Sequence, residues 1–574
     1  MSIREFEVFG RSVGQYLPSS VSDRTIGLSV LALLIYLNII PVVAIFVSSF
    51  MAEGLSMYES FTLANYEALA SKYGLLYNTL VFTLGSAVLT TVLGVAIAWV
   101  IGRTNAPFRR LFYYVIFFSF FLPPVIWEQT WVRLFAKRGF YATLLGLEQI
   151  PIRNLPGMVF IQSIRLVAFA LILLVPLFAS MDTSLEESAH MSGAGIWKTA
   201  TRITIPTVAP GIMTVFIFVT IISLESFRVP LVIGLPAKIE VLSTAIYEAA
   251  RVEPVNYGAA MAEGVAIILL ALPLLYLYRR FVARSERFQT VSGSGFKSNA
   301  IDIGRWRYVV SAVVGLYLLF TIVVPTIVMI YMSFMPFYIP PHAANPQLFT
   351  LDVWSEVLGN ARTWTSLQNS LVVAFTATTA TVFMGAALSW LIQKSEIPYR
   401  GLIDYVSFLP IAIPSVALAL GVVFIYLNVI PIGIYGTLVI IALAYVIRGI
   451  PGSVRIVDPA IIQLQDDLLE SAELSGAGRL RRVISIVIPT VAQTLSALWA
   501  FRFAFLMFEL PIVLMLYTTD TFMLSSYLYV LDSNAETTQA AVVGVLVMAL
   551  LVVVTVIVHK FGQYLGGGTK SLDV

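Results

Sequence analysis

Long uncharged runs of hydrophobic residues, each bounded by polar segments, recur along the chain. The clearest runs lie at residues 25–52, 73–102, 363–393 and 405–447. A membrane-spanning helix needs about 20 apolar residues, because the hydrocarbon core of a bilayer is about 30 Å thick. The first three runs therefore predict one spanning helix each, and the fourth predicts two helices around a turn at 428–436.

We predict twelve spanning helices, six in each half of the chain. Continuous apolar runs argue against a membrane barrel, whose strands are alternating segments of about ten residues. The predicted spans lie near 26–50, 76–102, 111–132, 156–180, 208–233 and 260–282, and near 308–334, 366–392, 402–428, 434–457, 491–516 and 538–560. The expected fold class is an all-α polytopic membrane protein.

Composition supports the same class. Hydrophobic residues make up 59% of the 574 residues and charged residues 12%, whereas soluble domains average roughly 45–50% and about 25%. The net charge is only +3, and no basic stripe with interleaved aromatic residues stands outside the predicted spans. The basic residues therefore predict membrane topology, and no nucleic-acid partner is expected. Cysteine is absent, which excludes disulfides and thiol chemistry.

Lys and Arg residues predict the orientation, because short cytoplasmic loops of membrane proteins are enriched in them. With the amino terminus inside, 23 of these residues fall on the cytoplasmic side, 8 outside and 4 within spans. Both termini are thus expected in the cytoplasm. The first hydrophobic run is too long for the apolar core of a signal peptide, so we expect it to remain as the first span.

A polar segment occurs twice. "ESAHMSGAGIWKTATRITIPTVA" begins at Glu187 and "ESAELSGAGRLRRVISIVIPTVA" begins at Glu470, with 13 of 23 positions identical and a separation of 283 residues. Each copy lies between the fourth and fifth predicted spans of its half. The repeat divides the chain into a first half at 1–283, a basic cytoplasmic linker at 284–306 and a second half at 307–574.

Each copy predicts a helix, a tight turn and a second helix on the cytoplasmic surface. The first helices, at 183–190 and 465–474, carry acids early, where the helix dipole favours them. Gly193 and Gly476 suit the turn because glycine adopts backbone conformations that other residues avoid. The second helices are expected to run to Pro206 and Pro489, where the chain re-enters the membrane.

The spacing of Glu-Ser-Ala, a glycine six residues after the Glu and Ile-Pro thirteen residues after the glycine resembles the EAA loop of binding-protein-dependent ABC importers. Ser188 and Ser471 replace the more common Ala. The resemblance covers nearly the whole chain and is closest to fused double permeases of the ferric-iron type, a group that includes thiamine permeases. The residues matching the two loops, at 183–207 and 465–490, are Glu187, Ala189, Gly193, Pro206, Glu470, Ala472, Gly476 and Pro489.

The resemblance implies a type I importer permease in a bacterial inner membrane. In such importers each loop inserts a coupling helix into a cytoplasmic ATPase subunit, so two loops imply two ATPase copies. A periplasmic binding protein delivers the substrate, and transport proceeds by alternating access. The alternative is that both segments are amphipathic surface helices kept alike only by duplication.

The chain itself is not expected to be an enzyme. A phosphate-binding loop needs Gly-x-x-x-x-Gly-Lys-Ser/Thr, and the segments beginning at Gly293 and Gly566 lack the Gly-Lys pair. ATP and Mg²⁺ are therefore expected on the partner subunits, with no cofactor in this chain. The three histidines, His190, His342 and His559, are far apart in the sequence, so we expect no metal centre and no catalytic residue.

Charged residues within the spans are the remaining candidates for function. A mid-membrane charge costs at least roughly 2.5–3.5 kcal/mol and usually faces protein or water. Arg165 and Arg448 are 283 residues apart, and Glu225 and Glu509 correspond within one residue. The resemblance implies that the fifth span, which carries both acids, lines the pathway.

Two interpretations of these charges remain open. Facing carboxylates would favour a cation, or each acid could pair with Arg228 or Arg502 and hold helices together. The two repeat-related arginines could instead anchor their helices by reaching toward the cytoplasmic interface.

Ferric iron is the expected substrate, because the fused halves and the acids of the fifth spans resemble the ferric-iron group. Thiamine, a polyamine or a phosphorylated solute are alternatives within the same class. A secondary transporter driven by an ion gradient is the alternative from a different class, since such proteins are also built from repeats, often inverted ones.

Overall fold

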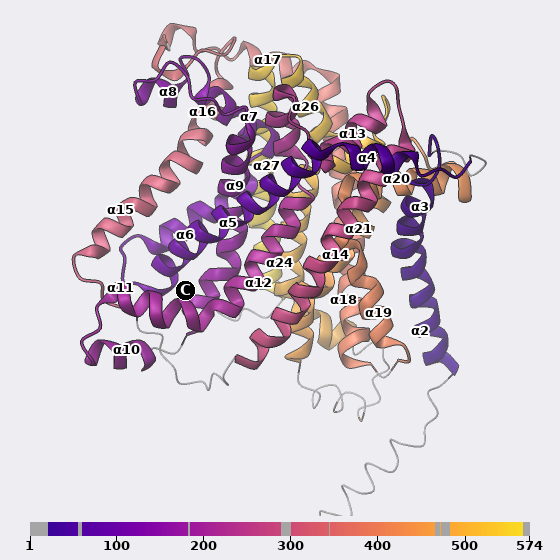
Figure 1. The fold of residues 1–574 in the computed structure, drawn as a ribbon, viewed down its shortest axis with the longest axis horizontal. Coiled ribbons are helices and arrows are strands. Elements are labelled where there is room, and N and C mark those ends of the chain that lie inside the picture. Colours follow the sequence, from indigo (N-terminus) through magenta and orange to yellow (C-terminus); the bar gives the residue numbers. More distant parts are fainter. Residues whose placement is uncertain are drawn as a thin grey trace, which may run out of the picture.

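A computed structural model describes most of the chain, in which the regular structure is helical apart from two isolated β-bridges. The described residues are 21–54, 60–181, 184–288, 300–343, 345–395, 397–464, 471, 474 and 483–565. Their helices form a bundle, with α10 and α11 at one end and α8, α17 and α26 at the other (Figure 1). The end with α10 is called the loop end below.

The helices of the first half end with a long helix that continues past residue 283 into the predicted linker. They are α2 (Val21–Leu34), η1 (Ile35–Ile39), α3 (Ile40–Ser48), α4 (Ala64–Ser71), α5 (Tyr73–Arg103), α6 (Arg109–Phe118), η2 (Ser119–Phe121), α7 (Pro124–Phe135), α8 (Phe140–Leu144), α9 (Leu155–Ala179), α10 (Ser184–Met191), α11 (Ile196–Thr199), η3 (Ala200–Thr204), α12 (Ile205–Leu224), η4 (Pro230–Gly234), η5 (Leu235–Ala237), α13 (Leu242–Arg251) and α14 (Tyr257–Phe288).

The second half repeats this order. Its helices are α15 (Trp306–Leu318), η6 (Leu319–Val323), α16 (Val324–Met332), η7 (Pro341–Ala343), η8 (Pro346–Leu348), α17 (Asp352–Gly359), α18 (Ala361–Lys394), α19 (Arg400–Phe408), η9 (Leu409–Ala412), α20 (Ser415–Phe424), η10 (Ile425–Val429), α21 (Leu438–Ile462), η11 (Val483–Val487), α24 (Ile488–Met507), α25 (Pro511–Leu516), α26 (Leu524–Ser533) and α27 (Thr537–Leu565).

Ten helices in the described residues are long and apolar enough to span a membrane, and three bent pairs raise the number to as many as 13. This confirms the all-α polytopic class. The third span of each half, predicted as one helix, is bent by 107° in the first half and 109° in the second. Pro123 and Pro414 lie at these breaks, where proline removes a backbone donor and crowds the preceding turn.

A third bent pair, Pro230–Ala237 with Leu242–Arg251 at 76°, was not among the predicted spans. Each arm is short, and Lys238 and Glu240 interrupt the apolar pattern between them. A hydrophobic run therefore does not reveal this hairpin.

Four of the ten continuous spans contain a π-helical turn just before a proline. The turns η1, η3, η6 and η11 precede Pro41, Pro206, Pro325 and Pro489, and η4 and η10, in two of the bent pairs, precede Pro236 and Pro431. A proline inside a helix clashes with the carbonyl four residues earlier, and a wider turn relieves that clash. The helix at Pro206 is consequently continuous: the chain crosses as one segment, Ile196–Leu224, instead of breaking at the proline as the sequence suggests.

The two halves interlock through their first spans. α3 packs on α20 of the second half, and α16 packs on α7 of the first half. Asn38 donates from Nδ2 to the carbonyl of Val406 at 2.9 Å, and the hydroxyls of Tyr36 and Tyr426 share a 2.5 Å hydrogen bond. Each half thus completes the bundle of the other.

Small residues let the longest helices approach closely, as is common where helices meet in membranes. α5 packs along α9 and α18 packs along α21. A Cβ added at Gly94 would lie 3.1 Å from Ala170 Cβ, and one added at Gly385 would lie 2.6 Å from Ser453 Cβ. The backbones of α5 and α9 are therefore in close contact along their length.

The described end of the linker is attached to the loop end of α5. Ile301 forms a parallel bridge with Thr104, and Asn105 donates from Nδ2 to Asp302 at 2.7 Å. The backbone N–H of Gly304 also donates to Asp302. These hydrogen bonds, the backbone one first, lower the pKa of Asp302 below its ordinary value.

Candidate functional site

The first repeated loop projects from the loop end of the bundle (Figure 1). It consists of α10, a turn and α11, which continues through η3 into α12. Glu187 is exposed and Ala189 is half-buried. Gly193 is exposed with φ of +79°, the left-handed region that favours glycine. Pro206 lies exposed in the first turn of α12.

Most of the second loop lies outside the described residues. Glu470, Ala472 and Gly476 are among those not described, whereas Pro489 lies half-buried in the first turn of α24. Leu474 is described and is 90% exposed, as is Met191 at the equivalent position 283 residues earlier. Both loops therefore present a fully accessible apolar side chain at the same point of the repeat.

The acid that fixes the first loop to the bundle is Glu186, the neighbour of the motif residue Glu187. It is buried and accepts from Arg103, whose Nε lies 2.9 Å from Oε2 and whose Nη2 contacts the same oxygen. Thr204 donates to the other oxygen. Arg103 Nη1 also donates to the carbonyl of Met181 at 3.1 Å.

The second half has no acid equivalent to Glu186. Leu469 stands at the matching position, and Lys394 is the counterpart of Arg103 at the end of α18. Lys394 Nζ donates to the carbonyl of Leu464 at 2.8 Å, which mirrors the contact of Arg103 with Met181. The loop motif alone does not single out Glu186. Alignment of the two halves could have identified it, because Glu186 is replaced by Leu469 and Arg103 by Lys394.

A second group of charges lies in the centre of the bundle, where the two halves meet. Arg448 donates from Nη2 to both carboxylate oxygens of Glu225, with Oε2 at 2.5 Å. Its Nε donates to Ser415 Oγ and its Nη1 to the carbonyl of Pro410, each at 3.2 Å. The Glu225 and Arg448 side chains are 18% and 19% exposed. This ion pair joins the two halves.

Arg165 has a different environment from its repeat equivalent. Its Nη1 lies 3.5 Å from Oε1 of Glu128, a fully buried residue. Among the described residues neither oxygen of Glu128 has a hydrogen-bond partner. Arg448 instead contacts Ser415 and Glu225, so the halves differ in the residues that face the arginine. The predicted pathway set did not include Glu128.

Glu509 does not mirror Glu225. It is 6% exposed, and its Oε1 has no hydrogen-bond partner among the described residues. Arg502 likewise leaves Nε and Nη2 without a partner in the described part of the chain. Arg228 donates from Nη1 to the carbonyl of Phe508 at 3.4 Å. In the described residues Glu225 pairs with Arg448, which neither interpretation of the sequence named as its partner.

The seven residues of this core charge cluster come from both halves. They are Glu128, Arg165, Glu225, Arg228, Arg448, Arg502 and Glu509.

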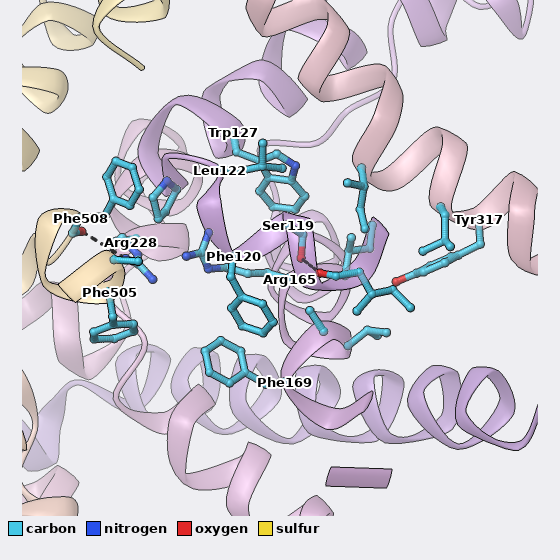
Figure 2. A pocket seen from close by; sticks show the side chains of 18 residues that line it. Ser119, Phe120, Leu122, Trp127, Arg165, Phe169, Arg228, Tyr317, Phe505 and Phe508 are labelled. Carbon is cyan, nitrogen blue, oxygen red and sulfur yellow. Dashed lines mark hydrogen bonds between the residues drawn. The ribbon is translucent and has the colours of Figure 1, made fainter. Parts of the chain in front are cut away.

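A cavity of about 60 Å³ opens beside the cluster (Figure 2). Arg165 and Arg228 line it together with the aromatic side chains of Phe120, Phe169 and Phe505. The described residues contain no group of three or more His, Asp or Glu side chains able to hold a metal ion.

The fold and these sites define a polytopic α-helical membrane protein with two repeat-related loops at one end and a charged core between its halves. The model of the family described as "Binding-protein-dependent transport system inner membrane component" matches residues 91–287 and again 382–563, which is more than half of the chain. The chain belongs to this family and carries two copies of its domain, as expected for a fused double permease.

Several characterised proteins are similar to the chain. The "Ferric transport system permease protein FbpB" of Actinobacillus pleuropneumoniae is 23% identical over 560 residues, covering 95% of this chain and 78% of that protein. The "Sulfate transport system permease protein CysW" of Synechocystis is 27% identical over 202 residues, covering 35% and 72%.

One solved structure that matches is a "bacterial alginate ABC transporter in complex with alginate pentasaccharide-bound periplasmic protein". It has 18% identity and a TM-score of 0.36, covering 46% of this chain and 99% of the matched chain. The family model and the similarity to permease proteins, not this structural match, show that the chain is a multi-pass inner-membrane permease of the ABC importer class.

Proposed function

We propose that the two loops dock onto two copies of a cytoplasmic ATPase subunit, so that the loop end of the bundle faces the cytoplasm. In this proposal both termini are cytoplasmic. ATP and Mg²⁺ bind only to the ATPase subunits, and a periplasmic binding protein delivers substrate at the opposite end. The observation that carries the proposal is the pair Met191 and Leu474, each 90% exposed at equivalent positions. A single exposed apolar side chain is common on a protein surface, but two at the same position of a repeated loop match the need for two alike docking sites.

The helices offer a direct route from loop to core. The segment Ile196–Leu224 is a single span that starts in the first loop and ends beside Glu225. In the second half, Ser485–Met507 ends close to Glu509 in the same way. Closure of the ATPase dimer would move both loops, and these helices would carry the movement to the core charge cluster and open the passage by alternating access.

For the substrate we propose ferric iron, supported by the similarity to FbpB over 95% of the chain. Glu225, Glu509, Arg165 and Arg448 would then lie along the passage. An anionic solute is the second candidate, favoured by a specific observation: the core charge cluster holds four arginines against three glutamates. An excess of positive charge in a medium of low dielectric repels a bare trivalent cation.

Introducing a charge on each loop tests the docking proposal. The double variant Met191→Glu and Leu474→Glu places a charge in each proposed apolar contact, so the ATPase subunit should no longer co-purify and ATP-driven uptake should stop. Leu147→Glu makes the same change at an exposed site after α8, at the other end of the bundle, and should retain both properties. Normal co-purification of the ATPase with the double variant would refute the docking site.

A further inference from the structure

The two arginines related by the repeat differ in how completely their donors are used. Arg448 donates to Glu225, Ser415 and the carbonyl of Pro410. Arg165 makes one ionic contact, at 3.5 Å with Glu128, and no hydrogen bond to any other described residue. A guanidinium group carries five N–H donors, and leaving them unused in a partly buried site is unfavourable. Arg165 is therefore available to a ligand.

Arg228 supplies a second guanidinium to the same cavity. Among the described residues it has no carboxylate within ion-pair distance, and its one hydrogen bond, to the carbonyl of Phe508, is 3.4 Å long. The heads of Arg165 and Arg228 lie next to each other in Figure 2, and like charges placed this close repel each other. An anion placed between them would remove this repulsion.

The walls of the cavity suit a small charged group. Phe120, Phe169 and Phe505 form an apolar lining, and an apolar lining strengthens electrostatic attraction because it lowers the local dielectric. The indole Nε1 of Trp127, which also lines the cavity, has no hydrogen-bond partner among the described residues. The volume of about 60 Å³ is several times the roughly 10–15 Å³ that one water needs.

We propose that the cavity between Arg165 and Arg228 binds an oxyanion group: a carboxylate, phosphate or sulfate. Planar guanidinium groups match the oxygens of such anions through paired hydrogen bonds. The anion is either a free solute or a ligand of a metal complex, since both present the same oxygens. That the site binds an anion does not depend on the proposed function. Only its placement on the transport passage rests on that function.

Binding to the purified full-length chain in lipid nanodiscs tests the site without the ATPase. Equilibrium dialysis with radiolabelled sulfate, inorganic phosphate and citrate, at constant ionic strength, should show saturable binding of at least one of them. Arg165→Gln and Arg228→Gln should each weaken it between about tenfold and a hundredfold, because a hydrogen bond to a charged group contributes roughly 1.5–3 kcal/mol. Arg165→Lys keeps the positive charge but loses the paired N–H donors of the guanidinium group. It should therefore weaken anion binding less than Arg165→Gln.

Two further variants distinguish binding inside the cavity from a general attraction of anions to the positive charges of the cluster. Arg502→Gln removes a charge from the same cluster, but Arg502 does not line the cavity, so binding should be nearly unchanged. Ala504→Phe fills the cavity and keeps both arginines, so binding should be lost in a folded protein. No saturable binding of any of the three anions, or equal weakening by Arg502→Gln, would overturn the proposal.

Ferric citrate labelled on both iron and citrate identifies the source of the anion. Retention of iron and citrate together indicates a metal complex, and retention of citrate alone indicates a free anion; either result supports the site. Iron retained without citrate, through the same two arginines, contradicts it. These measurements need no ATPase. If the docking variants above still bind the ATPase, the docking proposal is refuted but the anion site is not. If no anion binds, the anion site is refuted but the docking proposal is not.

Discussion

The ion pair between Glu225 and Arg448 connects the end of one half's fifth span to the other half's fourth span. Both side chains are only about a fifth exposed, so their charges are weakly screened. Removing one partner from a buried pair typically costs roughly 3–5 kcal/mol, because the other charge is left uncompensated. The pair therefore acts as a structural contact in the conformation described, whatever its part in transport.

A double-mutant cycle tests this contact. Glu225→Gln and Arg448→Gln should each lower the melting temperature of the purified protein clearly. The double variant should lose less stability than the two single variants added together, because neither charge is then left without its partner. Interacting pairs show coupling energies of roughly 0.5–3 kcal/mol. Additive losses would mean that the two residues do not stabilise each other.

Sequence spacing predicts which charges of the core correspond, but it does not predict their partners. Arg165 and Arg448 stand 283 residues apart, yet one faces Glu128 and the other Glu225. The partners come from bent spans and from the opposite half, and their positions depend on tertiary packing. The arginine nearest to Glu225 along the chain is Arg228, whereas its observed partner, Arg448, belongs to the other half.

At the scale of elements, a continuous helix connects each loop to the core. The sequence predicts the loop helices and the fifth span but places a break at Pro206. A proline is a strong helix breaker in general, and periodicity does not reveal that a π-helical turn, η3, accommodates it. The third spans show the opposite error: the hydrophobic run continues across Pro123 and Pro414, so the sequence predicts single helices where the chain is bent.

The anchor between Glu186 and Arg103 makes the first loop stiffer than it would otherwise be. Glu186→Gln removes the charge and should increase amide hydrogen exchange in α10, because α10 would lose its ionic attachment to α5. Exchange in the second loop, which has Leu469 at this position, should not change. Glu187→Gln, at the exposed neighbour, serves as the matched variant and should leave the exchange of α10 near normal. Unaltered exchange in Glu186→Gln would show that the anchor does not hold the loop.

At the scale of the whole molecule, the repeat predicts two parallel halves, and the structure adds that they exchange their first spans. Hydrophobic runs locate α3 and α16 but contain no information about which half they pack against. That choice depends on surface contacts such as Asn38 with Val406 and Tyr36 with Tyr426. Class and repeat architecture were thus accessible from the sequence, and the interlocking was not.

Orientation in the membrane is a prediction of the charge count. A reporter fused near Ser292, in the basic linker, should report the cytoplasm, because positive loops are retained there. A reporter near Asn345, after the first span of the second half, should report the periplasm. Measurement of both fusions in cells decides the orientation, and the reverse pair of signals would invert the topology.

In the proposed mechanism ATP drives the two loops together, and the helices transmit this motion to the opposite end. The chain has no cysteine, so single introduced cysteines can be spin-labelled selectively. Met191→Cys with Leu474→Cys reports on the loops, and Leu147→Cys with Ile432→Cys, both exposed, reports on the opposite end. The measurement is the inter-label distance in the reconstituted importer with and without trapped ATP. We predict a shorter distance between the loops and a longer one at the opposite end, whereas two unchanged distances during active ATP hydrolysis would contradict the account.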